Sequence, residues 1–559
     1  MRQAQEEARE RAEPARRLFD LVCAMRRGEI EPFTMGATIS DIDNHPQLAN
    51  AEASGDAFGA LHFPVVFPEV FLREKAGFDC VLGNPPWDKV MFEPQQFWVT
   101  RAPGLNALRP AERDERIDEL RDLFPEDAGD EKAERQRREA FQDHIATSFT
   151  HQGRGHYDYA KLFVERATAL MTDGWLGYVL PRQCLVLGGW KNLRALLLDG
   201  SQLEVVQARN RAGWIFDDVE FRYMVVLLQR APADSGSALA GGAEIWPVVH
   251  SPTEVAAIDT RPHISLPRTD VETLSDSYVL PWLDTANAAM VFDAMRSRPS
   301  LRSGEGWISG VHDARWDFRR TGPHGALART EQATGAWRVL MTRHVDPYAI
   351  SDTIPYATFV SDLPGLAKRA PGIALDGDPS LDANHPLIVF RHPSRNDDTR
   401  TLIATALSER GTLHNKGYVH GIRHEPGTDP EQLLAFLCFL NTYTCDWWAR
   451  RFVDRHVTAP VINNLRLPEW DRSVVSEAAD IAAARLSAHG SVRLAGGIAV
   501  ESGPGLRGLT TDELTVRAEL LALHGFGLTG DQVGVVLDDF SDRGLPPGLR
   551  AAIRDRADG

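Results

Sequence analysis

The tetrapeptide Asn84-Pro85-Pro86-Trp87 carries the residue types best suited to chemistry in this chain of 559 residues. The exocyclic amine of a nucleobase is a poor nucleophile because its lone pair is delocalised into the ring. A site helps by accepting both N–H hydrogens, which stabilises the positive charge that develops as the nitrogen attacks. The Asn84 side-chain oxygen and the Pro85 carbonyl are two such acceptors, and consecutive prolines restrict the backbone that holds them. Trp87 adds an aromatic face on which a base taken out of the double helix can stack.

A short apolar run stands directly in front of this tetrapeptide. Residues 78–82 (FDCVL) lead into Gly83 and the two prolines, which predicts a buried strand running into a rigid loop. In isolation, an Asn-Pro-Pro-aromatic sequence serves equally well as a strand end whose tryptophan packs in a core. The preceding strand gives the loop the right exit from a sheet and therefore favours the chemical interpretation.

Strands then alternate with helices, which predicts a largely parallel, doubly wound sheet. Apolar side chains recur at helical spacing after residue 158, and Asp173-Gly174 is expected to cap that helix. The expected elements are helices at 159–170 and 193–198 and strands at 175–180, 203–206 and 223–228.

With these elements in place, the sequence resembles the gamma-class adenine-N6 DNA methyltransferases, in particular the large methylases of type IIG and DISARM-like restriction–modification and phage-defence systems. The resemblance rests on residues 67–71 and 78–87, with support from 158–166, 177–181, 400–404 and 463–468. It implies a Rossmann-like core, S-adenosyl-L-methionine as cofactor and double-stranded DNA as substrate. By this likeness Asn84, Pro85, Pro86 and Trp87 take the catalytic roles described above.

The cofactor region of this family has no counterpart in the sequence. The family binds S-adenosyl-L-methionine at a glycine-rich loop upstream of the catalytic loop, and a carboxylate on the following strand holds the ribose. The residues before Asn84 contain no Gly-x-Gly, and the later candidate at 498–505 has a proline between its glycines. The cofactor-binding residues are therefore unknown. We expect an upstream-encoded partner chain to supply the glycine-rich loop, or the chain to be a truncated remnant.

Residues 301–470 have a charge balance unlike the rest of the chain. They contain 19 Lys and Arg against 19 Asp and Glu, so the remaining residues carry the whole net charge of −17. Basic side chains neutralise phosphates, and Arg reads guanine edges in the major groove. A globular domain with an ordinary charged surface is the alternative interpretation. The expected DNA contacts are Arg391, Arg395, Arg400, Lys416, Arg423, Arg451 and Arg455.

Other features limit the compartment and the cofactors. Five scattered cysteines without CxxC spacing indicate a reducing compartment, and the charged N-terminus is not a signal region. No apolar run approaches the roughly 18 residues of a membrane span. His414, His420 and His424 do not all share a helical i, i+4 frame, and turn signals at Gly417 and Gly421 interrupt the stretch, which argues against a metal site. We expect a cytoplasmic protein with neither a metal nor a membrane partner.

Together these features predict an α/β fold, in which a partial Rossmann-like methyltransferase sheet is followed by a mixed α+β target-recognition domain and a helical C-terminal tail. The predicted function is methyl transfer to N6 of a flipped-out adenine in DNA, within a restriction–modification or phage-defence system. Two alternatives remain open, a non-catalytic DNA-binding or scaffolding component of a defence complex and a cytosine-N4 methyltransferase. The expected segments are an N-terminal helical segment (1–60), the C-terminal half of the catalytic domain (61–235) with a helical insertion at about 90–155, a linker with connecting helices (236–300), the target-recognition domain (301–470) and the helical tail (471–559).

Overall fold

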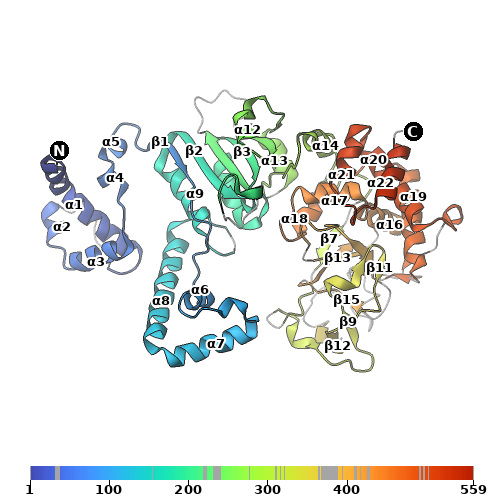
Figure 1. The fold of residues 1–559 in the computed structure, drawn as a ribbon, viewed down its shortest axis with the longest axis horizontal. Coiled ribbons are helices and arrows are strands. Elements are labelled where there is room, and N and C mark those ends of the chain that lie inside the picture. Colours follow the sequence, from blue (N-terminus) through green and yellow to red (C-terminus); the bar gives the residue numbers. More distant parts are fainter. Residues whose placement is uncertain are drawn as a thin grey trace. The chain divides into compact units, whose positions relative to one another are not determined.

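The computed structural model divides into two compact units (Figure 1). Unit 1 comprises Met1–Pro181, Gly188–Glu204 and Val225–Gly242, and unit 2 comprises Arg182–Leu187, Val205–Met224 and Ala243–Gly559. The structure describes all residues except 1, 32–37, 154, 200, 218–222, 231–240, 276, 309–310, 315, 320–321, 363–364, 367–387, 393, 408–411, 416, 425–427, 490–492, 495–497, 501–502 and 558–559.

The N-terminal residues of unit 1 form a small group of helices, as predicted. Leu21 and Ala24 of the first helix are buried against Ile42 and Ala51 of the next two, so an apolar stripe on a charged helix finds a local partner. The helices are α1 (Arg2–Arg26), α2 (Ile39–Asp43), α3 (Leu48–Phe58), α4 (Phe63–Val66) and α5 (Pro68–Phe71).

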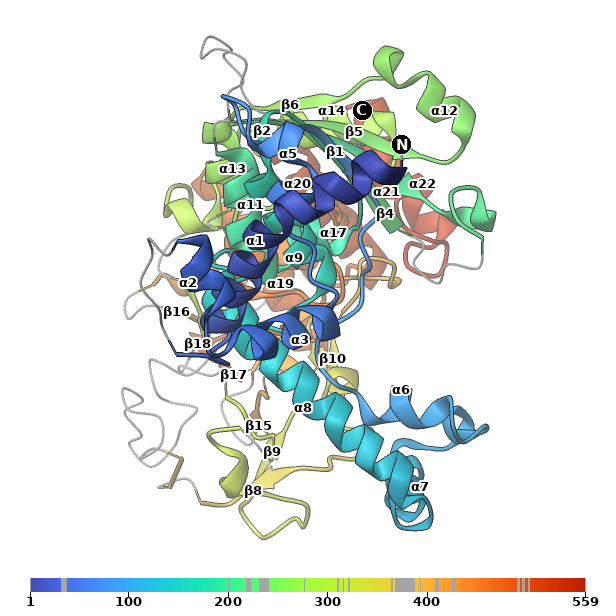
Figure 2. The ribbon, with the colours of Figure 1, turned by 90° about the vertical axis from the view of Figure 1, so that its left-hand side faces the viewer.

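The helical insertion expected near residues 90–155 is present as α6 (Pro94–Val99), α7 (Pro110–Leu123) and α8 (Pro125–Ser148). The first two helices lie at the far end of the long α8 in both ribbon views (Figures 1 and 2). Glu131 of α8 accepts hydrogen bonds from Trp98 Nε1 at 2.9 Å and Arg121 Nε at 2.7 Å. The Arg121 guanidinium lowers the pKa of this carboxyl to about 2. One buried carboxylate therefore ties the three helices together.

A six-stranded sheet follows the order β1-β2-β4-β3-β5-β6. Strands β1 and β2 are parallel, with Gly83 opposite Tyr178, whereas β5 and β6 are antiparallel, so the sheet is mixed rather than largely parallel. The last two strands lie where we expected a linker with connecting helices. The strands are β1 (Phe78–Gly83), β2 (Met171–Pro181), β3 (Gln202–Arg209), β4 (Tyr223–Arg230), β5 (Ala243–Val249) and β6 (Ile264–Leu266). After the helical insertion, the helices before β3 are α9 (Tyr159–Leu170), α10 (Gln183–Val186) and α11 (Lys191–Leu198).

The predicted helix cap at Asp173-Gly174 is wrong, because α9 ends at Leu170 and both residues lie inside β2. A Cβ atom at Gly174 would lie only 2.0 Å from the carbonyl oxygen of Asp79 on β1. Glycine is needed here because the two strands approach closely, which is a different reason from the cap that its sequence context indicated.

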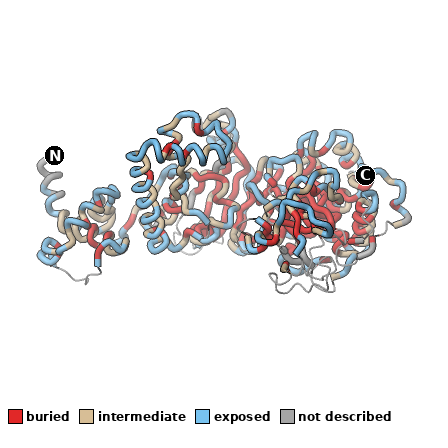
Figure 3. The backbone as a smooth tube through the Cα atoms, turned by 90° about the horizontal axis from the view of Figure 1, so that it is seen from below, coloured by how far each residue is buried: buried red, intermediate tan, exposed pale blue. Residues whose placement is uncertain are grey.

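The remainder of unit 2 is mixed α+β and then mainly helical, in line with the expected order. Buried residues are dense in this part of the chain and sparse near the N-terminus (Figure 3). Two small sheets have the orders β15-β9-β12-β8 and β14-β13-β16-β7. The strands are β7 (Val311–Ala314), β8 (Ala328–Arg329), β9 (Trp337–Val339), β10 (Val345–Asp346), β11 (Ala349–Ile350), β12 (Phe359–Val360), β13 (Ile388–Arg391), β14 (Ala404–Ala406), β15 (Thr412–Leu413), β16 (Val419–His424), β17 (Arg493–Leu494) and β18 (Ile498–Ala499). The helices are α12 (Pro252–Ala256), α13 (Arg268–Leu274), α14 (Ala286–Arg296), α16 (Pro430–Leu440), α17 (Tyr443–Arg450), α18 (Ala459–Asn463), α19 (Arg472–Ala488), α20 (Thr511–Phe526), α21 (Asp531–Asp538) and α22 (Pro547–Ala557).

In the part of the chain that the structure describes, no helix combines the length and apolar character needed to cross a bilayer.

Candidate functional site

The loop Asn84–Trp87 leaves the carboxyl end of β1 and is fixed on the neighbouring strand. Gly83 lies so close to Tyr178 that a Cβ atom there would be 3.1 Å from the ring carbon Cε1. Trp87 donates a hydrogen bond from Nε1 to the Val179 carbonyl of β2 at 3.3 Å. The indole is therefore positioned by the parallel strand pair.

The chain just beyond Trp87 is held by the segment that leads into α9. The Asp88 carbonyl accepts from Tyr159 N, and Val90 N donates to the Tyr157 carbonyl, both at 3.0 Å. The side chain of Asp158 caps α9 by accepting from Lys161 N at 2.8 Å. The loop is thus anchored both before and after the tetrapeptide, which keeps its acceptor groups preorganised.

Within the loop, Pro85 is buried and Trp87 is half-buried, whereas Asn84 and Pro86 are exposed. The Asn84 amide makes no side-chain hydrogen bond to any residue that the structure describes. A polar group held on a rigid loop without a partner is available to a ligand. Its oxygen and a neighbouring backbone carbonyl are sufficient to accept the two N–H groups of an exocyclic amine.

We predicted a buried strand in front of the loop, but most side chains of β1 are exposed. β1 stands at the edge of the sheet, and its exposed side chains include Leu82, with 72% of its surface open to solvent. Leu72, just before the strand, is 78% exposed. The apolar pattern correctly predicted a strand, but no further strand of the described chain covers its outer edge. None of the four loop residues lines the cavities of about 1020, 660 and 440 Å³ in the described chain.

The residues present do not fit S-adenosyl-L-methionine. Before Phe78 the described chain is helical and contains no strand that could lead into a glycine-rich loop. The later candidate begins in β18, and a Cβ atom at Gly503 would lie 2.5 Å from Asp480 Oδ2. That glycine packs against α19 and has no open cradle for a cofactor.

Three of the predicted DNA contacts lie at least partly at the surface. The side chains of Arg395 and Arg455 are 62% and 66% exposed, and each lies near a neighbouring carboxylate, at 3.0 Å and 4.0 Å. Arg391 is 29% exposed and pairs with Asp346 at 2.6 Å. Exposed ion pairs contribute little to the free energy of unfolding, so these arginines can bind a phosphate in place of the carboxylate with little loss of stability.

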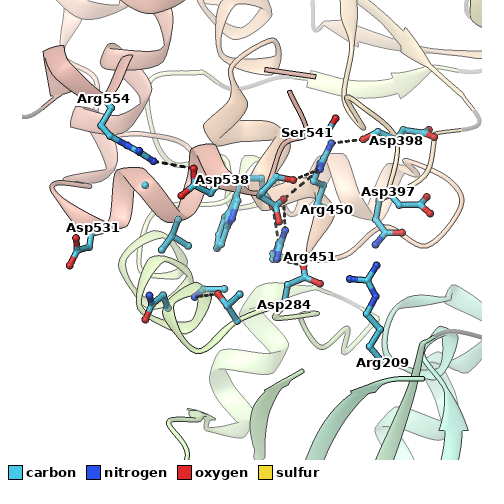
Figure 4. A pocket seen from close by; sticks show the side chains of 18 of the residues that line it. Arg209, Asp284, Asp397, Asp398, Arg450, Arg451, Asp531, Asp538, Ser541 and Arg554 are labelled. Carbon is cyan, nitrogen blue, oxygen red and sulfur yellow. Dashed lines mark hydrogen bonds and ion pairs between the residues drawn. The ribbon is translucent and has the colours of Figure 1, made fainter. Parts of the chain in front are cut away.

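Two other predicted contacts serve the fold, since Arg451 is buried and only 11% of the Arg400 side chain is exposed. Arg400 Nε donates to Asp446 at 2.7 Å, and Arg451, 2% exposed, pairs with Asp284 at 2.9 Å and Asp539 at 2.8 Å. Figure 4 shows Arg451 beside Asp284 in the lining of a cavity of about 1020 Å³. Both guanidinium groups are therefore committed to internal partners, which corrects the expectation that they contact DNA.

Of the last two predicted contacts, Lys416 and Arg423, the structure describes no side chain. Lys416 is not among the described residues, and of Arg423 only the backbone is described, in β16 opposite His312.

Sequence reasoning missed a stack of three imidazoles in the same region. The ring of His392 lies 3.9 Å from that of His420 and 4.7 Å from that of His456. No spacing in the sequence indicated this stack, because its members come from separate segments.

Among the described residues, no group of His, Cys, Asp or Glu side chains has the arrangement of a metal site. His414 and His420 are both buried. The Nε2 atom of His414 accepts a hydrogen bond from Trp316 N at 3.0 Å, so this imidazole satisfies a buried backbone donor of the small sheets.

No family model and no curated protein matches the sequence. Among solved structures, the chain is similar to the type IIG restriction endonuclease BpuSI, with 12% identity over 95% of this chain and 66% of that one and a TM-score of 0.27. It is also similar to the type IIL restriction-modification enzyme MmeI in complex with DNA, with 9% identity over 68% of this chain and 52% of that one and a TM-score of 0.36. The DrdV–DNA complex matches with 10% identity over 74% of this chain and 44% of that one, at a TM-score of 0.31. The chain thus spans about half to two thirds of these proteins, and similarity at this level carries no argument about its function.

Proposed function

We propose that this chain is the catalytic-loop and DNA-binding part of a DNA methyltransferase that modifies N6 of adenine in a restriction–modification or phage-defence system. The observation that carries the proposal is the anchored loop at the end of β1. It combines an exposed Asn84, a rigid Pro-Pro backbone and a Trp87 indole that is fixed to β2 through Val179.

In this proposal a target adenine leaves the helix and stacks on Trp87. The Asn84 side-chain oxygen and the Pro85 carbonyl accept the two hydrogens of the N6 amine. These hydrogen bonds favour a pyramidal nitrogen and stabilise the positive charge that develops on it during methyl transfer. The new N–C bond would form as the S–CH3 bond of the methyl donor breaks, a neutral thioether would leave, and the proton lost from N6 would pass to water, so that no covalent enzyme intermediate is required.

The methyl donor, S-adenosyl-L-methionine, would be held by a partner chain that carries the glycine-rich loop. The open edge of β1 supports this arrangement, because an uncovered edge strand with exposed apolar side chains is suited to pairing with a further strand. Leu72 and Leu82 would then become buried.

The proposal is tested by reconstitution. The purified chain is incubated with duplex DNA and S-adenosyl-L-methionine, alone and with the product of the adjacent upstream reading frame, and the digested DNA is analysed for methylated nucleosides. We expect N6-methyladenine only in the mixture. Calorimetric titration with S-adenosyl-L-methionine should likewise give heat only when both chains are present.

A non-catalytic DNA-binding component is the second candidate, and the close packing of Gly503 against Asp480, which leaves no cradle for a cofactor there, favours it. It predicts DNA binding by the chain, no heat from S-adenosyl-L-methionine in either titration and no methylated nucleoside. Formation of N4-methylcytosine instead of N6-methyladenine would assign the loop to the cytosine amine.

A further inference from the structure

Arg466 is a buried cation without a carboxylate partner among the described residues. Its residue surface is 5% exposed, and it lies on an extended segment fixed by two backbone hydrogen bonds, from Leu467 N to the Pro299 carbonyl at 2.8 Å and from Leu301 N to the Leu465 carbonyl at 2.9 Å. The backbone that carries Arg466 is therefore rigid, and the guanidinium group has a defined position.

The hydrogen bonds of this guanidinium go to uncharged acceptors, and its Cζ lies 5.8 Å from the centroid of the Trp448 ring. Nη1 donates to the Arg298 carbonyl at 3.1 Å and Nη2 to the Thr273 carbonyl at 3.3 Å, while Nε has no partner in the described chain. Burial, together with the nearby Arg302 and Arg296, lowers the pKa of Arg466 to about 10, and the charge of Asp270 opposes this shift only in part. An Arg side chain stays protonated at neutral pH, so a buried one without a counter-ion is strongly destabilising unless an anion completes the site.

The group lines a cavity of about 660 Å³ in unit 2, which is large enough for a nucleotide-sized ligand. Two other arginines of its wall already have carboxylate partners, since Arg296 pairs with Asp270 and Asp293, and Arg298 pairs with Glu469. Arg302 is exposed at the cavity and donates to the Glu272 carbonyl at 3.0 Å.

We propose that this cavity binds a phosphate group, with Arg466 as its buried cation and Arg302 as a second cation at the opening. The terminal nitrogens of a guanidinium suit phosphate oxygens, and the bond is stronger in a partly desolvated site. The same chemistry is offered by a phosphodiester of nucleic acid and by a free nucleotide or inorganic phosphate. Three carboxylates, those of Asp270, Asp293 and Glu305, also line the cavity. The first two pair with Arg296, and Glu305 opposes the anion and limits its affinity.

The test is a titration of the full chain with inorganic phosphate at constant ionic strength, followed by thermal melting and by calorimetry, without methyl donor or partner chain. We expect phosphate to raise the Tm of the wild-type chain. Arg302→Gln and Arg466→Met should each weaken phosphate binding by about tenfold or more, since each removes charged hydrogen bonds. Glu305→Gln should strengthen it. Arg109→Gln, which changes an exposed arginine of the helical insertion, is the matched control and should leave binding unchanged.

Arg302 is exposed, so its variant tests the site even if Arg466→Met fails to fold. The proposal is overturned if phosphate does not raise the Tm, or if Arg302→Gln and Arg109→Gln bind phosphate as the wild type does. Binding of duplex DNA and of adenosine monophosphate is then measured, to distinguish a backbone phosphodiester from a free phosphate compound as the ligand. If Arg302→Gln weakens DNA binding and phosphate competes with DNA, the ligand is a backbone phosphodiester; if only the nucleotide responds, it is a free phosphate compound. Because no methylation is measured, failure of the proposed function leaves this result intact.

Discussion

Two polar regions of this chain are built in opposite ways. Around α17, the carboxylate of Asp446 is fully buried and accepts from Arg400 at 2.7 Å and Arg450 at 3.2 Å. The carboxylate of Glu519 is also fully buried and accepts from Tyr443 N at 2.6 Å and Thr444 N at 2.9 Å at the start of the helix. At the end of β1, by contrast, Asn84 is exposed and makes no side-chain hydrogen bond within the described chain.

The difference separates residues that hold the fold from residues available to a ligand. A buried charge must be paired or it destabilises the protein, so the charged side chains around α17 form ion pairs and hydrogen bonds with other groups of the chain. An unpartnered polar group on a rigid, exposed loop contributes little to stability and keeps its capacity for a substrate. The Arg residues that composition suggested for DNA differ in the same way, since Arg451 is buried between two carboxylates, whereas Arg455 is 66% exposed and has only a long ion pair of 4.0 Å with Asp454.

The largest effect is expected from Asp446→Ala. It leaves the Arg400 guanidinium without its carboxylate and Arg450 with only its longer pair to Asp539 at 3.6 Å, which should lower the free energy of unfolding by about 3 to 5 kcal/mol. Urea unfolding measures the change. Asp346→Ala, which removes the exposed partner of Arg391, is the control and should change the free energy by less than about 1 kcal/mol. Equal changes in the free energy of unfolding would contradict the expected difference between the buried and the exposed ion pairs.

A smaller and pH-dependent effect is expected from Glu131→Gln in the helical insertion. The pKa of Glu131 is lowered from 4.5 to about 2, so its ionised form stabilises the folded state by about 1 to 3 kcal/mol above pH 4.5. That contribution is lost as the pH falls from 4.5 towards 2. The difference in stability between wild type and variant should therefore be full at pH 7 and shrink through this window. A difference that stays constant down to pH 2 would contradict the assigned pKa.

The smallest effect on stability is expected from Leu82→Ala, because Leu82 is 72% exposed on the edge strand. The free energy of unfolding should change by less than about 0.5 kcal/mol. Leu176→Ala on the adjacent strand is the matched control, and its fully buried side chain should make the same substitution destabilising by about 2 to 5 kcal/mol. If the partner chain pairs with β1, Leu82→Ala should weaken the association measured by analytical ultracentrifugation. Unchanged association would show that Leu82 does not contact the partner chain.

The sequence was informative where the signal is local. The apolar run before Asn84, the helix from Tyr159 to Leu170 and the strand after it could all be predicted from neighbouring residues. The exposure of β1 could not, because an apolar pattern indicates a face that needs cover without saying which chain covers it. Nor could the burial of Arg451 be predicted, since its partners Asp284 and Asp539 are distant in the sequence.

The central claim is that the Asn84 side chain holds the amine of the target base. Its most direct test is the amount of N6-methyladenine that the two-chain mixture forms on duplex DNA with Asn84→Ala in place of wild type. We expect methylation to be abolished while the affinity for DNA stays nearly unchanged, and Asn106→Ala, an exposed asparagine elsewhere in the same unit, to methylate as the wild type does. Full methylation by Asn84→Ala would contradict the account.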